Sequence, residues 1–209
     1  MRKMNNKGVL TVISGFSGAG KGTIMKALLK TYDRYALSVS ATTRKPRVGE
    51  EHGREYFFIS RDEFESMIAE DRLLEYARYV DNYYGTPKEY VVNNLNAGID
   101  VLLEIEVQGA LQIKEKFPEA VLVFVTPPSA AELKKRLVGR GTETMEVIEQ
   151  RMARAIEESE WMKAYDYLLI NDTLDECVKQ LHETIQSQRY RASQCDELIA
   201  EMQKELKEL

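Results

Sequence analysis

The sequence predicts an α/β fold in which a parallel β-sheet is flanked by helices and carries a small mixed α+β insertion and a lid. Short runs of β-branched residues alternate with segments of helical period, the pattern of successive βαβ units. The first expected strand ends at a glycine-rich turn that opens the first expected helix. The stretch 37–98 breaks the alternation, which marks it as an insertion. The chain therefore combines one core with added segments.

Four strand–helix pairs account for the core. They are 9–14 with 21–31, 100–106 with 109–116, 121–126 with 130–138, and 167–170 with a long helix from about Leu174. Asn171, Asp172 and Thr173 suit the turn and the N-cap before that last helix. Within the insertion we expect strands at 56–59 and 74–80 and helices at 62–70 and 88–95. The core sheet should have at least four parallel strands.

The 209 residues are expected to divide into four parts. The core takes 1–36, 99–138 and 151–192, the insertion 37–98, the lid 139–150 and a helical tail 193–209. The lid is predicted because 139–144 contains two glycines, two threonines and no apolar residue. The tail aligns Leu198, Met202, Leu206 and Leu209 on one helical face, but it is shorter than three heptads, so it could dock on the body or on a second copy of the chain.

Charge and composition exclude several classes of function. Lys plus Arg is 29 and Asp plus Glu is 34, a net charge of −5, which argues against nucleic-acid or membrane binding through overall charge. The longest apolar runs are far shorter than the roughly 20 residues that span a bilayer. The polar start of the chain lacks a secretory cleavage pattern, so we expect a cytoplasmic protein. Cys177 and Cys195 have neither zinc-site nor disulfide spacing and are expected to be free thiols.

The turn after the first expected strand has the pattern of a phosphate-binding loop. It reads Gly15, Phe16, Ser17, Gly18, Ala19, Gly20, Lys21, Gly22, Thr23. Its glycines allow successive N–H groups to surround an oxyanion, the helix N-terminus favours negative charge, and Lys21 supplies a mobile cation for the β- and γ-phosphates. Gly22 stands where the pattern has Ser or Thr, so a hydroxyl for Mg²⁺ falls to Thr23. The motif alone is compatible with a switch GTPase, a motor ATPase or a small-molecule kinase.

A second anion site is indicated inside the insertion. Arg44, Lys45, Arg47 and Arg54 lie within eleven residues of an acidic protein. Arginine forks, together with nearby tyrosine hydroxyls, suit a terminal phosphate. The alternative is a solvated basic loop whose cations pair with the neighbouring glutamates.

The run from Thr43 to Ile59, with Arg44, Arg47, Glu50, Gly53 and Tyr56 in register, resembles the signature of guanylate kinases. The similarity covers nearly the whole chain through the segments 73–76, 82–86, 103–109, 127–129, 137–143 and 170–172. Membership implies transfer of the γ-phosphate of ATP to GMP, and to dGMP, giving GDP and ADP, with Mg²⁺ bound together with ATP.

The resemblance also assigns residues to the GMP site. Arg44, Arg47, Tyr56 and Tyr84 would hold the phosphate, Ser40, Glu75, Thr86 and Glu106 would face the base, and Glu50 and Gly85 complete the set. A carboxylate such as Glu75 accepts from both guanine donors, whereas it would meet an acceptor on adenine. The family has aspartates where this chain has Glu104 and Glu106. Glu104, with Thr23, is expected on the Mg²⁺ side.

Catalysis by this family needs converging cations rather than a side-chain base, because the attacking phosphate oxygen of GMP is already an anion. The resemblance implies Lys21, Arg44, Arg136, Arg140 and Arg151 in this role, with Arg136 and Asn171 also at ATP. The alternative for Arg136 and Arg151 is a solvent-facing helix charge that pairs with nearby glutamates. Rival functions are an adenylate- or uridylate-type kinase, a catalytically silent module that binds phosphopeptides, and a GTPase switch, which would need an Asn-Lys-x-Asp stretch that this sequence lacks.

Overall fold

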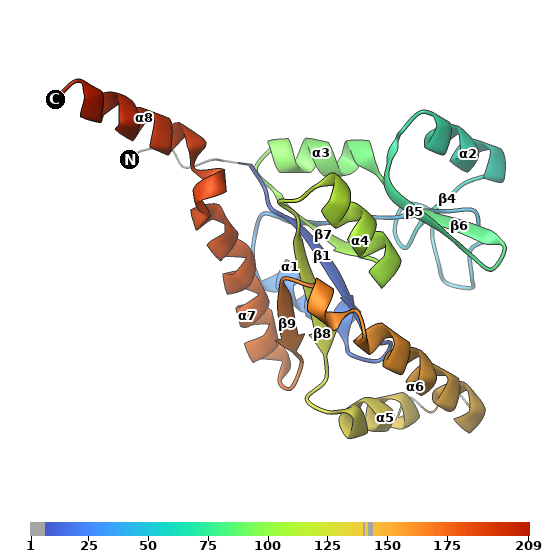
Figure 1. The fold of residues 1–209 in the computed structure, drawn as a ribbon. Helices are drawn as coiled ribbons and strands as arrows, with labels where there is room; N and C mark the ends of the chain where they lie inside the picture. The colour runs from blue at the N-terminus through green and yellow to red at the C-terminus, as the bar shows by residue number, and fades with distance from the viewer. Residues whose placement is uncertain (1–6, 140, 142–143) are drawn as a thin grey trace.

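The main sheet has five parallel strands in the order β2-β7-β1-β8-β9 (Figure 1). The computed structural model describes residues 7–139, 141 and 144–209. The strands are β1 (Leu10–Gly15), β2 (Tyr35–Leu37), β7 (Asp100–Glu104), β8 (Val121–Thr126) and β9 (Tyr167–Ile170). Their register is parallel throughout. The predicted parallel sheet is therefore confirmed, and β2 adds an edge strand that was not expected.

Helices cover both faces of this sheet (Figure 1). They are α1 (Lys21–Thr31), α4 (Val107–Lys116) and α7 (Leu174–Ser187). Two further helices, α5 (Ala130–Gly139) and α6 (Met145–Ser159), lie beyond the end of the sheet (Figure 1). Helices α1 and α7 pack against each other, α4 packs on β1 and β8, and α5 packs on α6. Because both faces are covered, the central strands are almost continuously apolar, as parallel strands usually are.

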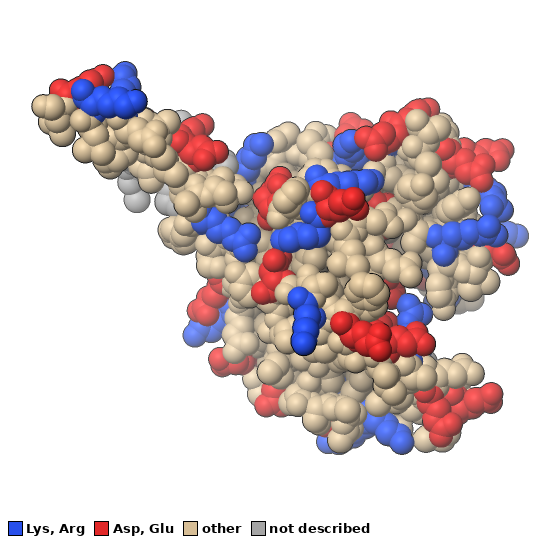
Figure 2. Space-filling model, viewed as in Figure 1, with Lys and Arg blue, Asp and Glu red and all other residues tan. Residues whose placement is uncertain are grey.

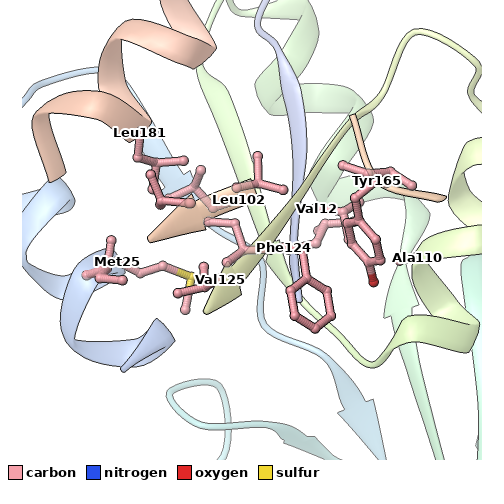
Figure 3. Packing of buried hydrophobic residues seen from close by; sticks show 14 of the residues in the cluster. Val12, Met25, Leu102, Ala110, Phe124, Val125, Tyr165 and Leu181 are labelled. Atoms are coloured by element: carbon pink, nitrogen blue, oxygen red, sulfur yellow. The ribbon is translucent and has the colours of Figure 1, made fainter. Parts of the chain in front are cut away.

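The largest apolar core lies directly beneath the β1–α1 turn (Figure 3). Val12, Phe124 and Leu181 are fully buried in it. The ring of Phe16 meets Phe124 edge-on at 5.0 Å, and Phe124 meets Tyr165 edge-on at 5.1 Å. Phe16, the second residue of the glycine-rich turn, thus anchors the turn to the core.

The insertion forms a second sheet with its own small core. Its strands, in the order β4-β3-β6-β5, are β3 (Ala41–Thr42), β4 (Phe57–Phe58), β5 (Leu73–Tyr79) and β6 (Asn82–Pro87). Helices α2 (Arg61–Ala69) and α3 (Lys88–Asn96) complete it. Phe64 is fully buried and stacks on Tyr83 with the ring centres 5.1 Å apart. The expected mixed α+β character is confirmed, although β3 and β6 were not predicted.

Two boundaries differ from the expected ones. The strand expected at 100–106 ends at Glu104, and Glu106 instead takes an extended backbone as the N-cap of α4. Glu106 therefore belongs to a turn, so the alternation of side chains between the two faces of the sheet does not fix its direction. Leu37, the expected first residue of the insertion, is the last residue of β2 in the main sheet.

A short helical turn, η1 (Met162–Ala164), lies between α6 and β9. After α7 come two more turns, η2 (Gln188–Tyr190) and η3 (Ala192–Gln194), and then helix α8 (Asp196–Lys207). Figure 1 shows α8 extending away from the body. No helix in the described part of the chain combines the length and the apolar character needed to span a bilayer.

Candidate active site

The glycine-rich turn between β1 and α1 has the geometry of an anion cradle. Gly15, Gly18 and Gly20 have φ angles of 145°, 96° and 95°, which side chains other than hydrogen rarely allow. Gly20 is the N-cap of α1, and no side chain of the described residues caps that helix. The N–H groups of Thr23 and Ile24 donate to the carbonyl oxygen of Gly20 at 3.1 Å. Helix geometry leaves the N–H groups of Lys21 and Gly22 without an acceptor inside the helix, and the helix dipole favours an anion there.

Lys21 lies folded back over this loop. Its Nζ donates to the carbonyl oxygen of Gly15 at 2.8 Å and to that of Phe16 at 3.4 Å. These carbonyls are neutral acceptors, so an arriving phosphate, a charged acceptor, would compete for the same ammonium. The lysine is placed where the loop would hold the end of a polyphosphate.

The side chain of Asn171 contacts the backbone of the phosphate loop. Its Nδ2 donates to the carbonyl of Ala19 at 2.8 Å, and the side chain is buried. A Cβ at Gly20 would lie 2.5 Å from the same nitrogen, which explains why glycine is required there. The structure thus places Asn171, expected at ATP, against the loop backbone.

One of the expected lid-region arginines, Arg151, reaches the loop, and another, Arg136, contacts the backbone of Asn171. Arg136 donates from Nη2 to the carbonyl of Asn171 at 2.9 Å and from Nε to Glu132 at 3.0 Å. Arg151 of α6 donates from Nη1 to Oγ of Ser17 at 3.0 Å. Arg140 lies outside the described residues. Both side chains are partly buried, and Arg136 pairs with Glu132 one turn earlier on α5, a feature that the alternative of a helix charge paired with nearby glutamates also expects.

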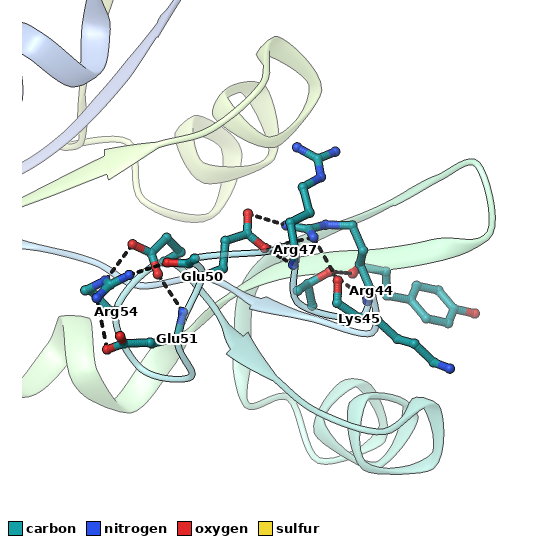
Figure 4. A network of polar contacts seen from close by, with 10 residues as sticks. Arg44, Lys45, Arg47, Glu50, Glu51 and Arg54 are labelled. Atoms are coloured by element: carbon teal, nitrogen blue, oxygen red, sulfur yellow. Dashed lines mark hydrogen bonds and ion pairs between the residues drawn. The ribbon is translucent and has the colours of Figure 1, made fainter.

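The insertion holds a second cationic centre, shown in Figure 4. Arg44 forms a bidentate ion pair with Glu50, in which Nη1 and Nη2 donate to the two carboxylate oxygens at 2.9 and 3.0 Å. The backbone N–H of Arg47 donates to the same carboxylate at 2.7 Å. These contacts, led by that of Arg44, lower the pKa of Glu50. The guanidinium of Arg44 also lies over the Tyr56 ring, 5.4 Å from its centre, and Tyr56 meets Tyr84 edge-on. Arg44, Tyr56 and Tyr84 are therefore brought together.

Not every cation of that run joins the centre. Arg54 is exposed and pairs with Glu51 and Glu55, so for this residue the solvated-loop alternative is the better description. The side chains of Lys45 and Arg47 are exposed as well. In Figure 4 the Arg54 pairs form a group separate from the Arg44 contacts.

Glu75 is a buried carboxylate in the wall of the insertion. Only 4% of the residue is exposed, and its Oε1 accepts from the hydroxyl of Thr86 at 2.7 Å. Burial raises the pKa of Glu75, and the Thr86 hydrogen bond opposes that rise. A Cβ at Gly109 would lie 2.8 Å from Oε2, so the first turn of α4 approaches the carboxylate closely. Gly85 is needed for packing, since a Cβ there would lie 2.9 Å from the Glu75 carbonyl oxygen.

An acidic group stands at the end of β7, close to the phosphate loop. Partial desolvation raises the pKa of Glu104, repulsion by Glu106 adds to the rise, and Lys21 opposes it. The Oε2 of Glu104 lies 4.0 Å from the position of a Cβ at Gly22, and the neighbouring Thr23 is exposed in the first turn of α1. The carboxylate of Glu104 and the hydroxyl of Thr23 are hard oxygen donors of the kind that Mg²⁺ prefers. The described residues contain no group of three or more acidic, His or Cys side chains able to hold a metal, so an ion here would need phosphate and water ligands as well.

The sequence analysis missed two residues of this region, Arg154 and Glu158. Arg154 donates from Nη2 to Glu106 at 2.7 Å and from Nε to Glu158 at 3.1 Å. Burial, followed by repulsion from Glu106, raises the pKa of Glu158. The i, i+3 spacing from Arg151 to Arg154 was the available signal, because it places both on one face of a helix.

One chain thus carries two anion-binding centres, a phosphate loop on the main sheet and an arginine–tyrosine cluster on a separate small sheet. Such a pair defines a P-loop kinase of the class that phosphorylates a second, smaller phosphorylated substrate. A family model described as guanylate kinase matches residues 7–188. The chain belongs to the guanylate kinase family, and its activity is the ATP-dependent phosphorylation of GMP to GDP.

Individual relatives agree with this assignment. A guanylate kinase of Clostridioides difficile is 54% identical over 95% of this chain and 97% of its own length. One of Enterococcus faecalis is 50% identical over 99% of this chain and 100% of its own. The crystal structure of guanylate kinase from Anaplasma phagocytophilum, 29% identical, superposes with a TM-score of 0.72 over 91% of this chain and 90% of the other.

Replacing Glu75 with glutamine should separate stability from guanine binding. Burial raises the folded pKa of Glu75 above its ordinary 4.5, so as pH rises the unfolded state loses this proton first and the native protein loses stability. Glu75→Gln should therefore raise the free energy of unfolding by roughly 1 kcal/mol at pH 7 and leave it unchanged below pH 4. The KM for GMP should rise about 100-fold, because an amide N–H would oppose the guanine donors.

Thermal unfolding across this pH range and steady-state kinetics check both effects. Glu115→Gln, at an exposed position of α4, is the matched control. A less stable Glu75→Gln protein with an unchanged KM for GMP would contradict this role for the buried carboxylate.

Proposed function

We propose that ATP binds at the β1–α1 loop, that GMP or dGMP binds on the insertion, and that the γ-phosphate passes directly between them. The observation that carries this assignment is the buried Glu75 carboxylate, held by Thr86 on a sheet separate from the phosphate loop. The ATP site comprises Gly15 to Thr23 with Arg136 and Asn171. The GMP site comprises Ser40, Arg44, Arg47, Glu50, Tyr56, Glu75, Tyr84, Gly85, Thr86 and Glu106.

Guanine is selected by hydrogen-bond polarity. Its N1–H and N2–H groups donate, and a carboxylate only accepts, so Glu75 satisfies both donors. Adenine would place an acceptor against the same oxygens, and a buried mismatch costs on the order of 1–3 kcal/mol or more. The resemblance to the family implies dGMP as a second substrate.

The chain's own residues supply positive charge along the path of the phosphoryl group. When ATP binds, the ammonium of Lys21 donates to its phosphates in place of the loop carbonyls. Arg44 and the neighbouring tyrosines hold the phosphate of GMP. Arg136 and Arg151 approach from the other side of the loop, and Arg140 completes the set by resemblance. The transferred group carries its charge on equatorial oxygens, so donors arriving from several elements stabilise it best.

Mg²⁺ fits beside Thr23 and Glu104, the oxygen donors at the mouth of the loop. When bound with ATP, the ion neutralises charge on the phosphates. Thr23 would offer its hydroxyl, and Glu104 would accept from a water ligand of the ion.

The experiment offers ATP and Mg²⁺ with GMP, dGMP, AMP, UMP or CMP in turn and follows ADP formation. We expect turnover with GMP and dGMP and no turnover with AMP, UMP or CMP. Absence of turnover with GMP would reject the proposal.

Lys21→Met should lower kcat with GMP by about 10² to 10³-fold, because one preorganised cation is lost from the transition state. Its fold should be unchanged by circular dichroism. Lys30→Met, in the exposed last turn of α1, is the matched control and should retain wild-type kcat. Equal activity of the two variants would show that the loop lysine is not catalytic.

Closure over both nucleotides is part of this proposal. Figure 2 shows the surface hollowed between the insertion and α6, and closing this hollow would exclude water that competes with GMP for the phosphoryl group. Amide hydrogen exchange should therefore slow in 37–98 and 139–150 when a non-hydrolysable ATP analogue and GMP bind together. Identical exchange in those segments with and without nucleotides would contradict closure.

We also propose that α8 pairs with a second copy of the chain. Ile199, Met202 and Leu206 are 39%, 42% and 63% exposed, and they lie at helical spacing on one side. Sedimentation over a concentration series should show a dimer or larger assembly. The double variant Met202→Glu with Leu206→Glu should reduce this assembly to monomer, whereas Gln203→Glu should leave it intact. A monomeric wild-type chain at all concentrations would overturn this part.

A further inference from the structure

One side chain of α6 connects three parts of the molecule. Arg154 donates to Glu106 of the core at 2.7 Å and to Glu158 of its own helix at 3.1 Å. Its guanidinium also lies over the ring of Tyr79, 5.7 Å from the centre, at the end of β5 in the insertion. A single cation therefore contacts the lid-side helix, the acidic end of the main sheet and the insertion.

The same face of α6 reaches the phosphate loop one turn earlier. Arg151 donates to Oγ of Ser17 at 3.0 Å, and residues three apart share a helical face. Helix α6 therefore touches the ATP side through Arg151 and the expected guanine side through Arg154.

The Arg154–Glu106 pair is poorly suited to stabilise the fold. Side-chain exposure is 42% for Arg154 and 73% for Glu106, and ion pairs this accessible contribute little to folding free energy. What the pair does fix is the conformation of Glu106, a long side chain that would otherwise sample several rotamers. Arg154 contacts Oε2 of Glu106, and among the described residues no donor contacts Oε1.

Glu158 in turn holds Arg154 in place. Its side chain is 14% exposed and accepts from Nε, which leaves Nη2 directed at Glu106. Glu106 and Glu158 repel each other, and Arg154 lies between them. Without this cation, Glu106 would turn away from Glu158 and toward solvent.

We propose that Arg154 is a positioning residue for GMP binding: it holds Glu106 by one oxygen so that the other is aimed at the guanine edge. This inference rests on the proposed role of Glu106 at the base. It makes the GMP site complete only when α6 is docked, and the docked helix is also the one that carries Arg151 to the ATP loop.

Arg154→Gln should raise the KM for GMP about 10-fold, as expected for the loss of one charge-assisted contact. The KM for ATP and kcat should change less than about twofold, and the midpoint of thermal unfolding should move by no more than about 2 °C. Arg154→Lys should recover part of the affinity for GMP. Arg72→Gln, which removes an exposed ion pair with Glu70, is the control and should change none of these values. An unchanged or lower KM for GMP in Arg154→Gln would overturn the inference.

Glu106→Gln separates this inference from the function on which it rests. If Glu106→Gln leaves the KM for GMP unchanged, the role of Glu106 at the base fails and the inference fails with it. If Glu106→Gln raises that KM and Arg154→Gln does not, only the inference fails. In the double variant, Arg154→Gln should add less than about twofold to the effect of Glu106→Gln, since its action passes through that carboxylate. Full additivity would overturn the positioning role.

Discussion

The architecture depends on overcoming the repulsion between two polyanions that must react with each other. A single rigid pocket lined with cations would leave those cations facing each other before substrate arrives. Under the proposed site assignment the cations are distributed over separate elements, with Lys21 at the loop, Arg44 on the insertion, and Arg136 and Arg151 on α5 and α6. Each of these elements is stabilised by its own packing, so no cluster of like charges has to be built into one core.

Each of these cations has a protein acceptor in the structure. Lys21 binds loop carbonyls, Arg44 binds Glu50, Arg136 binds Glu132 and the carbonyl of Asn171, and Arg151 binds the Ser17 hydroxyl. Such contacts keep long side chains ordered near their targets and lower the entropy that binding must remove. Most of these acceptors are neutral or partly solvated, so phosphate oxygens can replace them. The buried Glu75 differs, because its Thr86 contact leaves acceptor capacity for a ligand that brings donors.

Much of the core could be predicted from sequence because buried parallel strands leave unmistakable apolar runs, as in β1 and β8. Strands β2 and β3, of three and two residues, were missed because so short a segment has no period to detect. The phosphate loop was predictable since its function requires local backbone geometry. The contacts of Glu106, Arg154 and Asn171 were not, because charged and amide side chains on helices and turns look alike in sequence, and only tertiary packing decides what they meet. Asn171 illustrates the point, since its partner Ala19 lies 152 positions away.

That separation has a consequence for how the protein is made. The glycine-rich loop between β1 and α1 is synthesised well before the amide that fixes its curvature, because Asn171 directly follows β9. A nascent chain therefore possesses the glycine-rich segment long before it possesses the shape of the cradle. The curvature that Asn171 gives the loop is therefore a product of the completed sheet and not of the local sequence alone.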